Sequence, residues 1–281
     1  MKRLAVLGSP IAHSLSPALH TAAYRVLGLD WEYGLADVAT GGLAAFLENL
    51  DDSWVGLSLT MPLKREVIAL LDEASPLVEE LGVANTLLLA RDGAELRLAG
   101  FNTDVDGIVR AIEWRAGRSA GIAAHAAILG GGATASSALA AAVRLGATRI
   151  ALYLRDPARA STQTELAARL GVPLEVRPLD ELAESGPLGL VLSTLPGGVE
   201  LPPVLPSGPD AILLDVAYDP WPSRLAEAWE SAGGVAVSGL DMLLEQAVGQ
   251  IRLFTGGAQD QPLADEADVR AAMRAAVDLP A

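Results

Sequence analysis

Three consecutive glycines interrupt an apolar run and are followed by an alanine-rich stretch, in the order AAILGGGATASSA over residues 126–138. This order predicts a strand, a tight turn and a helix, because glycine permits the sharp turn that such a connection requires. Backbone amides and the positive end of the helix could then receive a pyrophosphate. Gly130 and Gly132 match the first two glycines of a dinucleotide-binding fingerprint, whereas the small residue Ser136 follows at a different spacing. An ordinary glycine turn remains the alternative.

A second apolar segment, expected to be a strand at 149–154, ends about twenty residues after the glycines, where dinucleotide-binding domains read the ribose. An acidic residue there would hydrogen-bond the 2′-hydroxyl of NAD, whereas arginine suits the 2′-phosphate of NADP. Arg155 and Arg159 favour NADP, with Asp156 as a cap of the next helix. NAD stays open if Asp156 faces the ribose, and a solvated charge cluster is the third possibility.

Composition narrows the class of protein. The length of 281 residues and an apolar content of 51% suffice for two packed domains. The net charge of −15 disfavours a nucleic-acid or anionic-membrane surface, so local groups must hold any anionic ligand. Cysteine is absent, which excludes disulfides and thiol chemistry and is compatible with the cytoplasm. The histidines His13, His20 and His125 are not spaced as a metal site, and we expect no metal.

No stretch predicts a membrane-spanning helix, since the glycine triplet interrupts the alanine-rich region 121–142. Lys2 and Arg3 precede a short apolar run and are similar to the start of a signal peptide, but Pro10 and Pro17 end that run too early. We therefore expect a cytoplasmic protein, a monomer or homodimer, whose partner is a small molecule and neither nucleic acid nor membrane.

Strand-like and helix-like segments alternate along the chain, which predicts an α/β fold with mostly parallel sheets. In the first hundred residues we expect strands at 4–7, 31–35 and 55–59 and helices at 17–27, 43–50 and 63–71. A Rossmann-type skeleton follows, with a helix at 104–114 and strands at the glycine turn, 149–154, 188–193 and 211–216. An apolar helix at 239–254 is expected to pack back on the first unit, and a further helix at about 264–276 follows.

Short polar motifs follow several expected strands. In SPIAHSLSP, Ser14 and Ser16 lie beside a helix start, where hydroxyls could receive a small carboxylate. Alternatively, Ser16 is only an N-cap with Pro17 at the first helical position. In SLTMPLK, Lys64 falls in the first turn of a helix, where a cation meets an unfavourable dipole, and this favours a functional role. The segments 82–87 and 100–107 are by themselves typical of turns and caps.

Taken in order, the motifs SPIAHSLSP, SLTMPLK, VANTL, NTD, GGGATASSA and SGLDMLLEQA resemble the shikimate dehydrogenase family over roughly residues 4 to 255. The resemblance implies reversible NADPH-dependent reduction of 3-dehydroshikimate to shikimate, a step of aromatic amino acid biosynthesis. It also implies an α/β substrate-binding domain (1–102 plus 239–281), whose C-terminal helices pack back on it, and an NADP-binding Rossmann-type domain (103–238).

The resemblance further implies roles for individual positions. Lys64 and Asp104 match the catalytic pair. The substrate-binding positions are Ser14 and Ser16 for the carboxylate, Thr60, Asn85 and Gln246 for ring hydroxyls, and Tyr218 near the substrate. The cofactor-binding positions are Gly130, Gly132, Ala133, Arg155, Arg159, Ser193, Thr194, Gly239 and Met242.

The chemistry of ketone reduction explains the catalytic pair. Hydride delivery leaves negative charge on the oxygen, so a proton donor must lie within hydrogen-bond reach. A free lysine titrates at about pH 10.4. Burial would favour release of the Lys64 proton, while Asp104 would orient the ammonium and limit that shift. The two residues are therefore treated as a coupled pair.

Departures from the family pattern keep alternatives open. They are Ser58 for asparagine, Phe101 for aspartate, Val105 for glycine, Asp156 where threonine is common, and a loosely similar turn at 193–196. The alternatives are a quinate/shikimate dehydrogenase using NAD, an aminoshikimate-pathway dehydrogenase, and a non-catalytic dinucleotide-binding sensor. Serine at both 14 and 16 favours shikimate over quinate, and the presence of both Lys64 and Asp104 favours an enzyme over a sensor.

Overall fold

The computed structural model describes residues 1–93, 95–117, 124–202 and 204–280. The chain forms two compact units, the first from Met1–Thr103 and Gln246–Ala281 and the second from Asp104–Glu245. Helix α9 (Gly239–Phe254) is divided between them, so the chain returns to the first unit within this helix.

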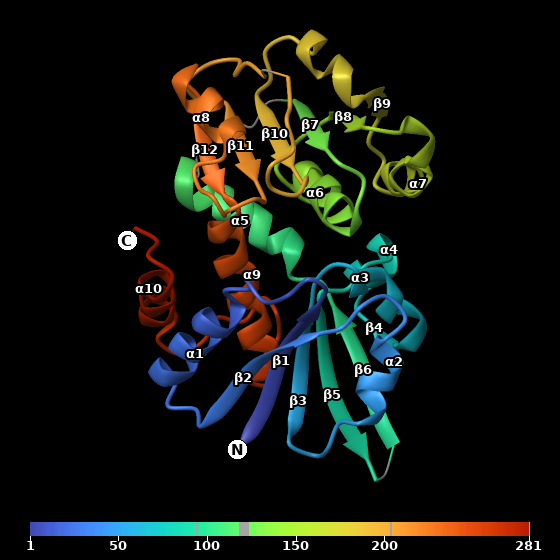
Figure 1. Cartoon of the computed structure of the whole chain (residues 1–281), viewed down its shortest axis with the longest axis vertical. Helices are drawn as coiled ribbons and strands as arrows, with labels where there is room; N and C mark the ends of the chain where they lie inside the picture. The colour runs from blue at the N-terminus through green and yellow to red at the C-terminus, as the bar shows by residue number, and fades with distance from the viewer. Residues whose placement is uncertain (94, 118–123, 203, 281) are drawn as a thin grey trace. The chain divides into compact units, whose positions relative to one another are not determined.

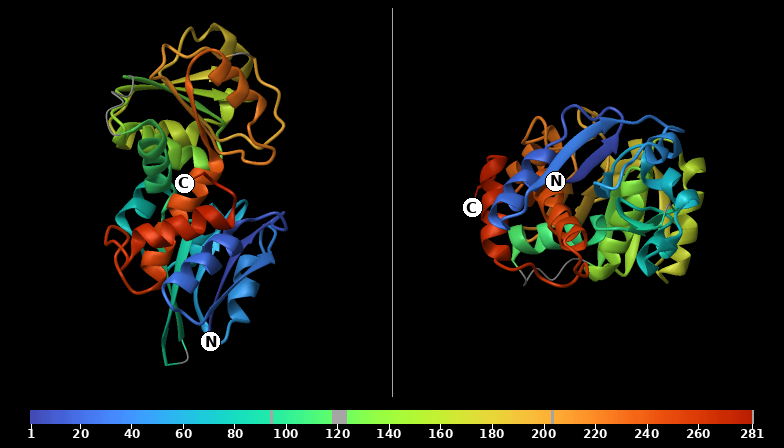
Figure 2. Two further views of the ribbon diagram at one scale, coloured as in Figure 1. Left: turned by 90° about the vertical axis from the view of Figure 1, so that its left-hand side faces the viewer. Right: turned by 90° about the horizontal axis from the view of Figure 1, so that it is seen from below.

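The first unit is built on a six-stranded sheet in the order β2-β1-β3-β5-β6-β4. Its strands are β1 (Lys2–Gly8), β2 (Trp31–Asp37), β3 (Trp54–Leu59), β4 (Glu73–Ala74), β5 (Thr86–Asp92) and β6 (Glu95–Phe101). The strands β2, β1 and β3 are parallel, whereas β5 is antiparallel to both β3 and β6. The expected mostly parallel sheet is confirmed here with one exception. β4 also pairs in parallel with β6, and among the described strands only β5 runs antiparallel, in a long hairpin with β6 that needs no crossover helix (Figures 1 and 2).

Helices cover both faces of this sheet (Figure 1). They are α1 (Ser16–Val26), α2 (Leu43–Glu48), α3 (Leu63–Glu66), α4 (Pro76–Leu81), the second half of α9, and α10 (Glu266–Ala276). Side chains alternate along β3 because successive residues of a strand point to opposite faces. Leu57 and Leu59 join the core with α2, α3 and α4. Gly56 faces α9, and a Cβ on it would lie 2.3 Å from Phe254 Cε1.

The second unit has a fully parallel sheet in the order β12-β11-β10-β7-β8-β9. Its strands are β7 (His125–Leu129), β8 (Arg149–Leu154), β9 (Leu174–Pro178), β10 (Leu190–Ser193), β11 (Ile212–Asp215) and β12 (Val235–Ser238). Its helices are α5 (Asp104–Ala116), α6 (Ala133–Arg144), α7 (Ser161–Arg169) and α8 (Arg224–Ser231). The expected Rossmann-type architecture is confirmed, and its strand order reverses between β7 and β10.

A buried ion cluster fastens α10 to α9 within the first unit. Arg252, 3% exposed, donates through Nε and Nη2 to the two carboxylate oxygens of Glu266, at 2.8 and 2.6 Å. Arg270 also binds Glu266, and the N–H of Leu263 donates to it at 2.9 Å. Burial alone would raise the pKa of Glu266, but these hydrogen bonds outweigh it and lower the pKa to about 2.

We expect Glu266→Gln to lower the free energy of unfolding at neutral pH by about 3 kcal/mol, because Arg252 loses the charge that compensates its burial. Since the folded pKa of Glu266 is depressed, its contribution is complete above the unfolded value of 4.5 and is lost as pH falls toward about 2. Urea titrations at several pH values should therefore show the gap to wild type closing in acid. Glu200→Gln, which removes an exposed ion pair to Arg224, is the control and should cost under about 0.5 kcal/mol.

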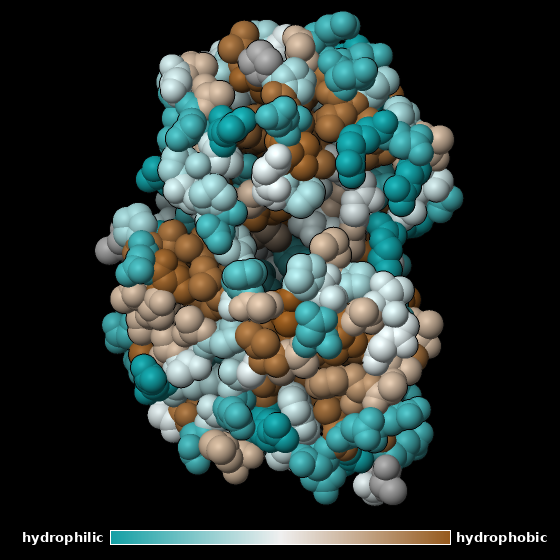
Figure 3. Space-filling view, in the orientation of Figure 1, coloured by the Kyte–Doolittle hydropathy of each residue, from teal (hydrophilic) through white to brown (hydrophobic). Residues whose placement is uncertain are grey.

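On the visible face of each unit, apolar residues form separate patches between polar ones (Figure 3). No helix among the described residues is long and apolar enough to cross a membrane.

Candidate active site

Polar residues of the first unit gather at one edge of its sheet. Strand pairing sets Leu7 opposite Leu59, the last residue of β3, and Ser58, the residue before it, opposite Thr86 at the start of β5. The residues that follow β1 and β3 therefore lie at the same edge as the residue that precedes β5. Two backbone hydrogen bonds close this edge, from Thr60 N to Leu7 O at 2.9 Å and from Leu59 N to Asn85 O at 2.7 Å.

Gly8 permits the loops after β1 and β3 to approach each other. A Cβ on Gly8 would lie 2.3 Å from Thr60 Cγ2 and 2.8 Å from Met61 O, closer than real Cβ atoms come. The N–H of Ser9 donates to Met61 O at 2.9 Å. A glycine is therefore needed here to hold Thr60 against the loop that carries the two serines.

Ser14 and Ser16 lie at the start of helix α1, and neither is its N-cap residue. The N-cap residue is Leu15, with no side-chain cap hydrogen bond, and Ser16 is the first helical residue. The N–H of Ser16 donates to Ser14 Oγ at 3.3 Å, which holds the two serines together. The interpretation of Ser16 as a plain N-cap is thus wrong, since its hydroxyl does not serve the helix.

Lys64 is 8% exposed, in helix α3 directly after β3, and its carbonyl accepts from Ala84 N at 2.9 Å. The single helix expected at 63–71 is instead four α-helical residues followed by a 3₁₀ turn at Val67–Leu70. Such a short helix has little dipole, so the argument from an unfavourable dipole loses its weight. A stronger signal in the sequence is that Lys64 is one of only two lysines in the chain.

Asn85 connects three elements of the first unit. It is 1% exposed, and its Nδ2 donates to Thr103 Oγ1 at 2.9 Å and to Gln246 Oε1 at 3.1 Å. Its Oδ1 accepts from Thr103 N at 2.8 Å and from Thr86 Oγ1 at 2.9 Å. The structure therefore brings Asn85 and Gln246 into direct contact at the edge that carries Thr60 and Lys64.

A buried polar group lies beneath this edge and was not foreseen from the sequence. Gln250 Nε2 donates to Asn85 O and to Thr86 Oγ1, both at 3.1 Å, and its Oε1 accepts from Ser58 Oγ at 2.8 Å. Burial, partly opposed by a hydrogen bond to Gln250, lowers the pKa of His20 to about 3, so the imidazole is neutral. The available signal was the position of Gln250 one helical turn after Gln246, which places both amides on the same side of the helix.

In the second unit the glycine loop follows β7, where the strand order reverses. Gly130 has φ +102°, which favours glycine, and a Cβ there would lie 2.7 Å from Thr194 Oγ1. The Thr194 hydroxyl donates to Leu129 O at 2.9 Å. Gly130 and Thr194 therefore line the point at which open parallel sheets bind nucleotides.

Helix α6 begins at this loop without a side-chain cap. Gly132 is its N-cap residue and Ala133 its first helical residue. The first amides of the helix are thus available to an anion, which the helix dipole also favours. Ser136 and Ser137 are fully buried, so these small residues allow close packing of the helix.

The turn after β8 shows what the side chain of Asp156 binds. Asp156 is the N-cap of a 3₁₀ turn at Pro157–Arg159, and its Oδ1 accepts from Ala158 N at 3.1 Å. Arg155 and Arg159 are exposed, and among the described residues neither guanidinium has a hydrogen-bonded or ion-pair partner. The capping role expected for Asp156 is confirmed, and two unpaired cations stand beside it.

The other site residues implied by the family resemblance lie near the carboxyl ends of β10, β11 and β12 or at the start of α5. Ser193 ends β10, Gly239 begins α9, and a Cβ on Gly239 would lie 2.0 Å from Val216 O. Burial, with a smaller contribution from the neighbouring Asp219, raises the pKa of Tyr218. Asp104, 3% exposed, is the first residue of α5.

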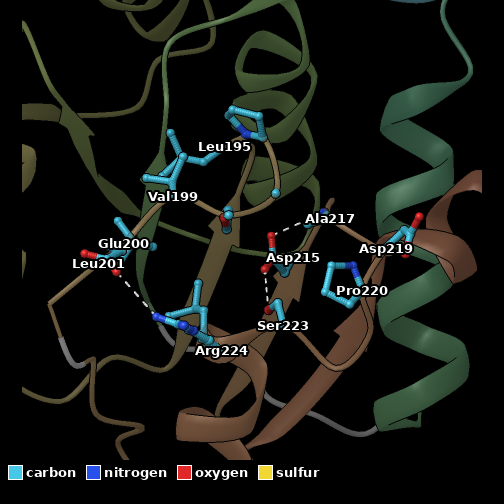
Figure 4. Close-up of a pocket in the computed structure, with 15 residues that line it drawn as sticks. Leu195, Val199, Glu200, Leu201, Asp215, Ala217, Asp219, Pro220, Ser223 and Arg224 are labelled. Atoms are coloured by element: carbon cyan, nitrogen blue, oxygen red, sulfur yellow. Dashed lines mark hydrogen bonds and ion pairs between the residues drawn. The ribbon is translucent and has the colours of Figure 1, made fainter. Parts of the chain in front are cut away.

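A cavity of about 240 Å³ lies between the loops that follow β10 and β11. Figure 4 shows the residues that line it. Asp215 lies in its wall and accepts from Ser223 Oγ at 2.7 Å and from Ala217 N at 3.3 Å. Burial raises the pKa of Asp215, and these hydrogen bonds partly oppose the shift. The Asp215–Ser223 pair, which the sequence did not reveal, fixes the loop that carries Tyr218.

The two units thus hold different groups of the implied residues. The first unit holds Ser14, Ser16, Thr60, Lys64, Asn85 and Gln246. The second unit holds Asp104, Tyr218 and the cofactor-binding positions Gly130, Gly132, Ala133, Arg155, Arg159, Ser193, Thr194, Gly239 and Met242.

Comparison with known proteins gives consistent matches. Residues 6–87 match the family model described as "Shikimate dehydrogenase substrate binding domain". The shikimate dehydrogenase (NADP(+)) of a Thermus thermophilus strain is 37% identical over 276 residues, covering 96% of this chain and 99% of that protein. The crystal structure of Mycobacterium tuberculosis shikimate dehydrogenase is 37% identical with a TM-score of 0.77, covering 98% of this chain and 99% of that one. A Thermus thermophilus shikimate 5-dehydrogenase, solved in complex with NADP(H) and shikimate, is 32% identical with a TM-score of 0.78. The match covers 98% of this chain and 100% of that one.

Proposed function

The chain belongs to the shikimate dehydrogenase family, and we infer from this membership that it catalyses the reversible NADPH-dependent reduction of 3-dehydroshikimate to shikimate. The observation that carries this function is the near full-length similarity to NADP(+)-dependent shikimate dehydrogenases, one of them solved with both ligands. The chain keeps a lysine and an aspartate at the positions of the catalytic pair, which favours an enzyme over a sensor.

The substrate is assigned to the first unit. The adjacent Ser14 and Ser16 supply hydroxyl donors for the carboxylate of the substrate. Thr60, Asn85 and Gln246 at the same sheet edge supply donors and acceptors for the ring hydroxyls. The family resemblance also implies a place near the substrate for Tyr218, whose raised pKa keeps the phenol protonated and able to donate.

NADP is assigned to the second unit. Gly130 has no room for a side chain, the first turn of α6 has no side-chain cap, and Arg155 and Arg159 have no partner within the described part of the chain. Together these features fit a pyrophosphate and a 2′-phosphate. Ser193, Thr194, Gly239 and Met242 at the neighbouring strand ends suit the nicotinamide half. NADPH, when bound, supplies the hydride.

We assign the proton transfer of the reaction to Lys64 and Asp104. As the ketone carbon accepts hydride, its oxygen gains negative charge that a donor must neutralise. The Lys64 ammonium donates a proton to that oxygen in reduction, and the resulting amine takes the proton back in oxidation, while the Asp104 carboxylate orients the Lys64 side chain. Both side chains are almost fully buried, which strengthens their electrostatic interaction with a bound substrate.

The function is tested by initial rates of absorbance change with purified protein, combining shikimate or quinate with NADP⁺ or NAD⁺. Turnover of shikimate with NADP⁺ is the expected result. A preference for quinate would reassign the substrate, a preference for NAD⁺ would reassign the cofactor, and no turnover in any combination would leave an aminoshikimate-pathway dehydrogenase or a sensor as the better account.

We expect the double substitution Arg155→Ala with Arg159→Ala to raise the KM for NADP⁺ by about 10- to 100-fold, because charge-assisted hydrogen bonds to the 2′-phosphate are lost. The KM for NAD⁺, which lacks this phosphate, should stay unchanged. Arg149→Ala is the matched control, since Arg149 is the first residue of β8 and Arg155 follows its last residue, so the two lie at opposite ends of the same strand. Equal loss of affinity for both dinucleotides would contradict the assignment.

We place the reaction in the cytoplasm, supported by the absence of cysteine and by the small-molecule substrates, with the protein as a monomer or homodimer. Cell fractionation and light scattering test these two points.

A further inference from the structure

A buried polar atom without a hydrogen-bond partner among the described residues lies beneath the glycine loop. It is Oε1 of Gln163, a residue of helix α7 whose side chain is 1% exposed. The other end of the same amide is engaged, since Nε2 donates to Gly131 O at 2.8 Å. An unpaired buried acceptor is unfavourable, so this glutamine is not explained by stability alone.

The hydrogen bond from Gln163 orients one peptide of the glycine loop. The peptide joining Gly131 to Gly132 is trans and planar, so its C=O and N–H point in opposite directions. With Gly131 O held toward α7, the N–H of Gly132 is directed away from α7. Gly132 is the N-cap residue of α6 and makes no side-chain cap hydrogen bond. The pyrophosphate is assigned to this end of the helix.

Three successive glycines need such a restraint, because glycine loses the most conformational freedom on ordering. Gly130 is anchored by its N–H, which donates to Tyr153 O at 3.0 Å. Gly132 is anchored by its carbonyl, which accepts from Ala135 N at 3.1 Å. Gln163 provides the corresponding anchor for Gly131, the residue between them, through a side chain that is itself fixed by burial.

We propose that Gln163 is a positioning residue for the cofactor, which orders the glycine loop before NADP binds and so raises the affinity for NADP without touching the reacting atoms. The benefit is preorganisation, since part of the ordering cost is met before the ligand arrives. The proposal rests on the proposed function insofar as the glycine loop is the pyrophosphate site.

The test uses the full-length chain with Gln163→Met, which keeps the length of the side chain but removes its donor and its unpaired acceptor. Calorimetry should show the Kd for NADP⁺ rising about five- to tenfold, as expected for loss of one ordering hydrogen bond. The KM for shikimate, and kcat at saturating NADP⁺, should stay within about twofold, and the thermal midpoint should stay within about 2 °C.

Two further variants separate the hydrogen bond from packing. Gln163→Leu lacks the donor and differs from methionine in shape, so similar losses of NADP⁺ affinity in both variants support the hydrogen bond. Thr164→Met places the same new side chain on the neighbouring exposed position of α7 and should leave the Kd unchanged.

An unchanged Kd in Gln163→Met overturns the proposal. So does a parallel rise in both KM values with a large fall in thermal midpoint, or failure of both apolar variants to fold, because either result assigns Gln163 a general structural role. A wild-type chain that binds NADP⁺ but does not oxidise shikimate refutes the proposed activity instead, and the calorimetric comparison still decides the role of Gln163.

Discussion

Lys64→Ala is expected to lower kcat for shikimate oxidation by about 10³-fold while the Kd for NADP⁺ stays within about twofold. The substitution removes the proposed proton acceptor for the hydroxyl of shikimate, so the oxidation must proceed without a positioned base. Because the interaction is needed most in the transition state, kcat and kcat/KM should fall by similar factors. Initial rates and calorimetry with NADP⁺ measure the two quantities separately.

The scarcity of lysine gives this experiment a clean control. Lys2, the other lysine of the chain, begins β1 and so lies at the opposite end of that strand from Gly8 and the proposed site, and Lys2→Ala should leave kcat unchanged. Lys64→Met, which preserves most of the buried apolar stem, separates loss of the amine from loss of packing. A Lys64→Ala enzyme that retains more than about a tenth of wild-type kcat would exclude Lys64 as the principal proton carrier.

Asp104→Asn is expected to lower kcat/KM for shikimate by about 10²-fold, because the amide keeps the shape of the carboxylate but removes the charge that orients Lys64. Steady-state kinetics with shikimate at saturating NADP⁺ measure this effect.

Asp106→Asn is the matched control for Asp104, since both carboxylates lie in the first turn of α5. Asp106 binds Arg144 at 2.6 Å and is half-buried. Its substitution should leave kcat/KM within about twofold, as a partly exposed ion pair contributes little. If kcat/KM fell equally in both variants, the effect would come from negative charge at the start of α5. It would not come from a specific interaction of Asp104 with Lys64.

Several features of the fold follow from local sequence. The strand, turn and helix at 126–138 were predictable because glycine conformations and apolar periodicity act over a few residues. The cap formed by Asp156 was predictable for the same reason. The β5–β6 hairpin carried a comparable local signal, two apolar segments joined through Asp92 and Gly93, but the strands expected in the first hundred residues did not include it.

Other features depended on distant parts of the chain. Ser16 has the residue type and position of an N-cap, yet the helix begins one residue earlier and leaves its hydroxyl unused. The helix expected at 63–71 ends at Glu66 and continues as a 3₁₀ turn; the β-branched Val67 and Ile68, which favour helix weakly, were a local signal for this change that the expectation missed. Gln163 and Gln250 looked like ordinary polar residues, because only the folded chain shows what each one binds.

By itself, the sequence determined the chemical groups present, the backbone freedom at Gly130, the parallel second unit and the resemblance to a family, since each is carried by residue type or by short-range order. The tertiary structure alone decided that Asn85 meets Gln246, 161 residues away, and that Gln163 holds Gly131. The physical reason is that such hydrogen bonds depend on strand register and helix packing, which sum many weak long-range contacts and are not encoded in any local pattern.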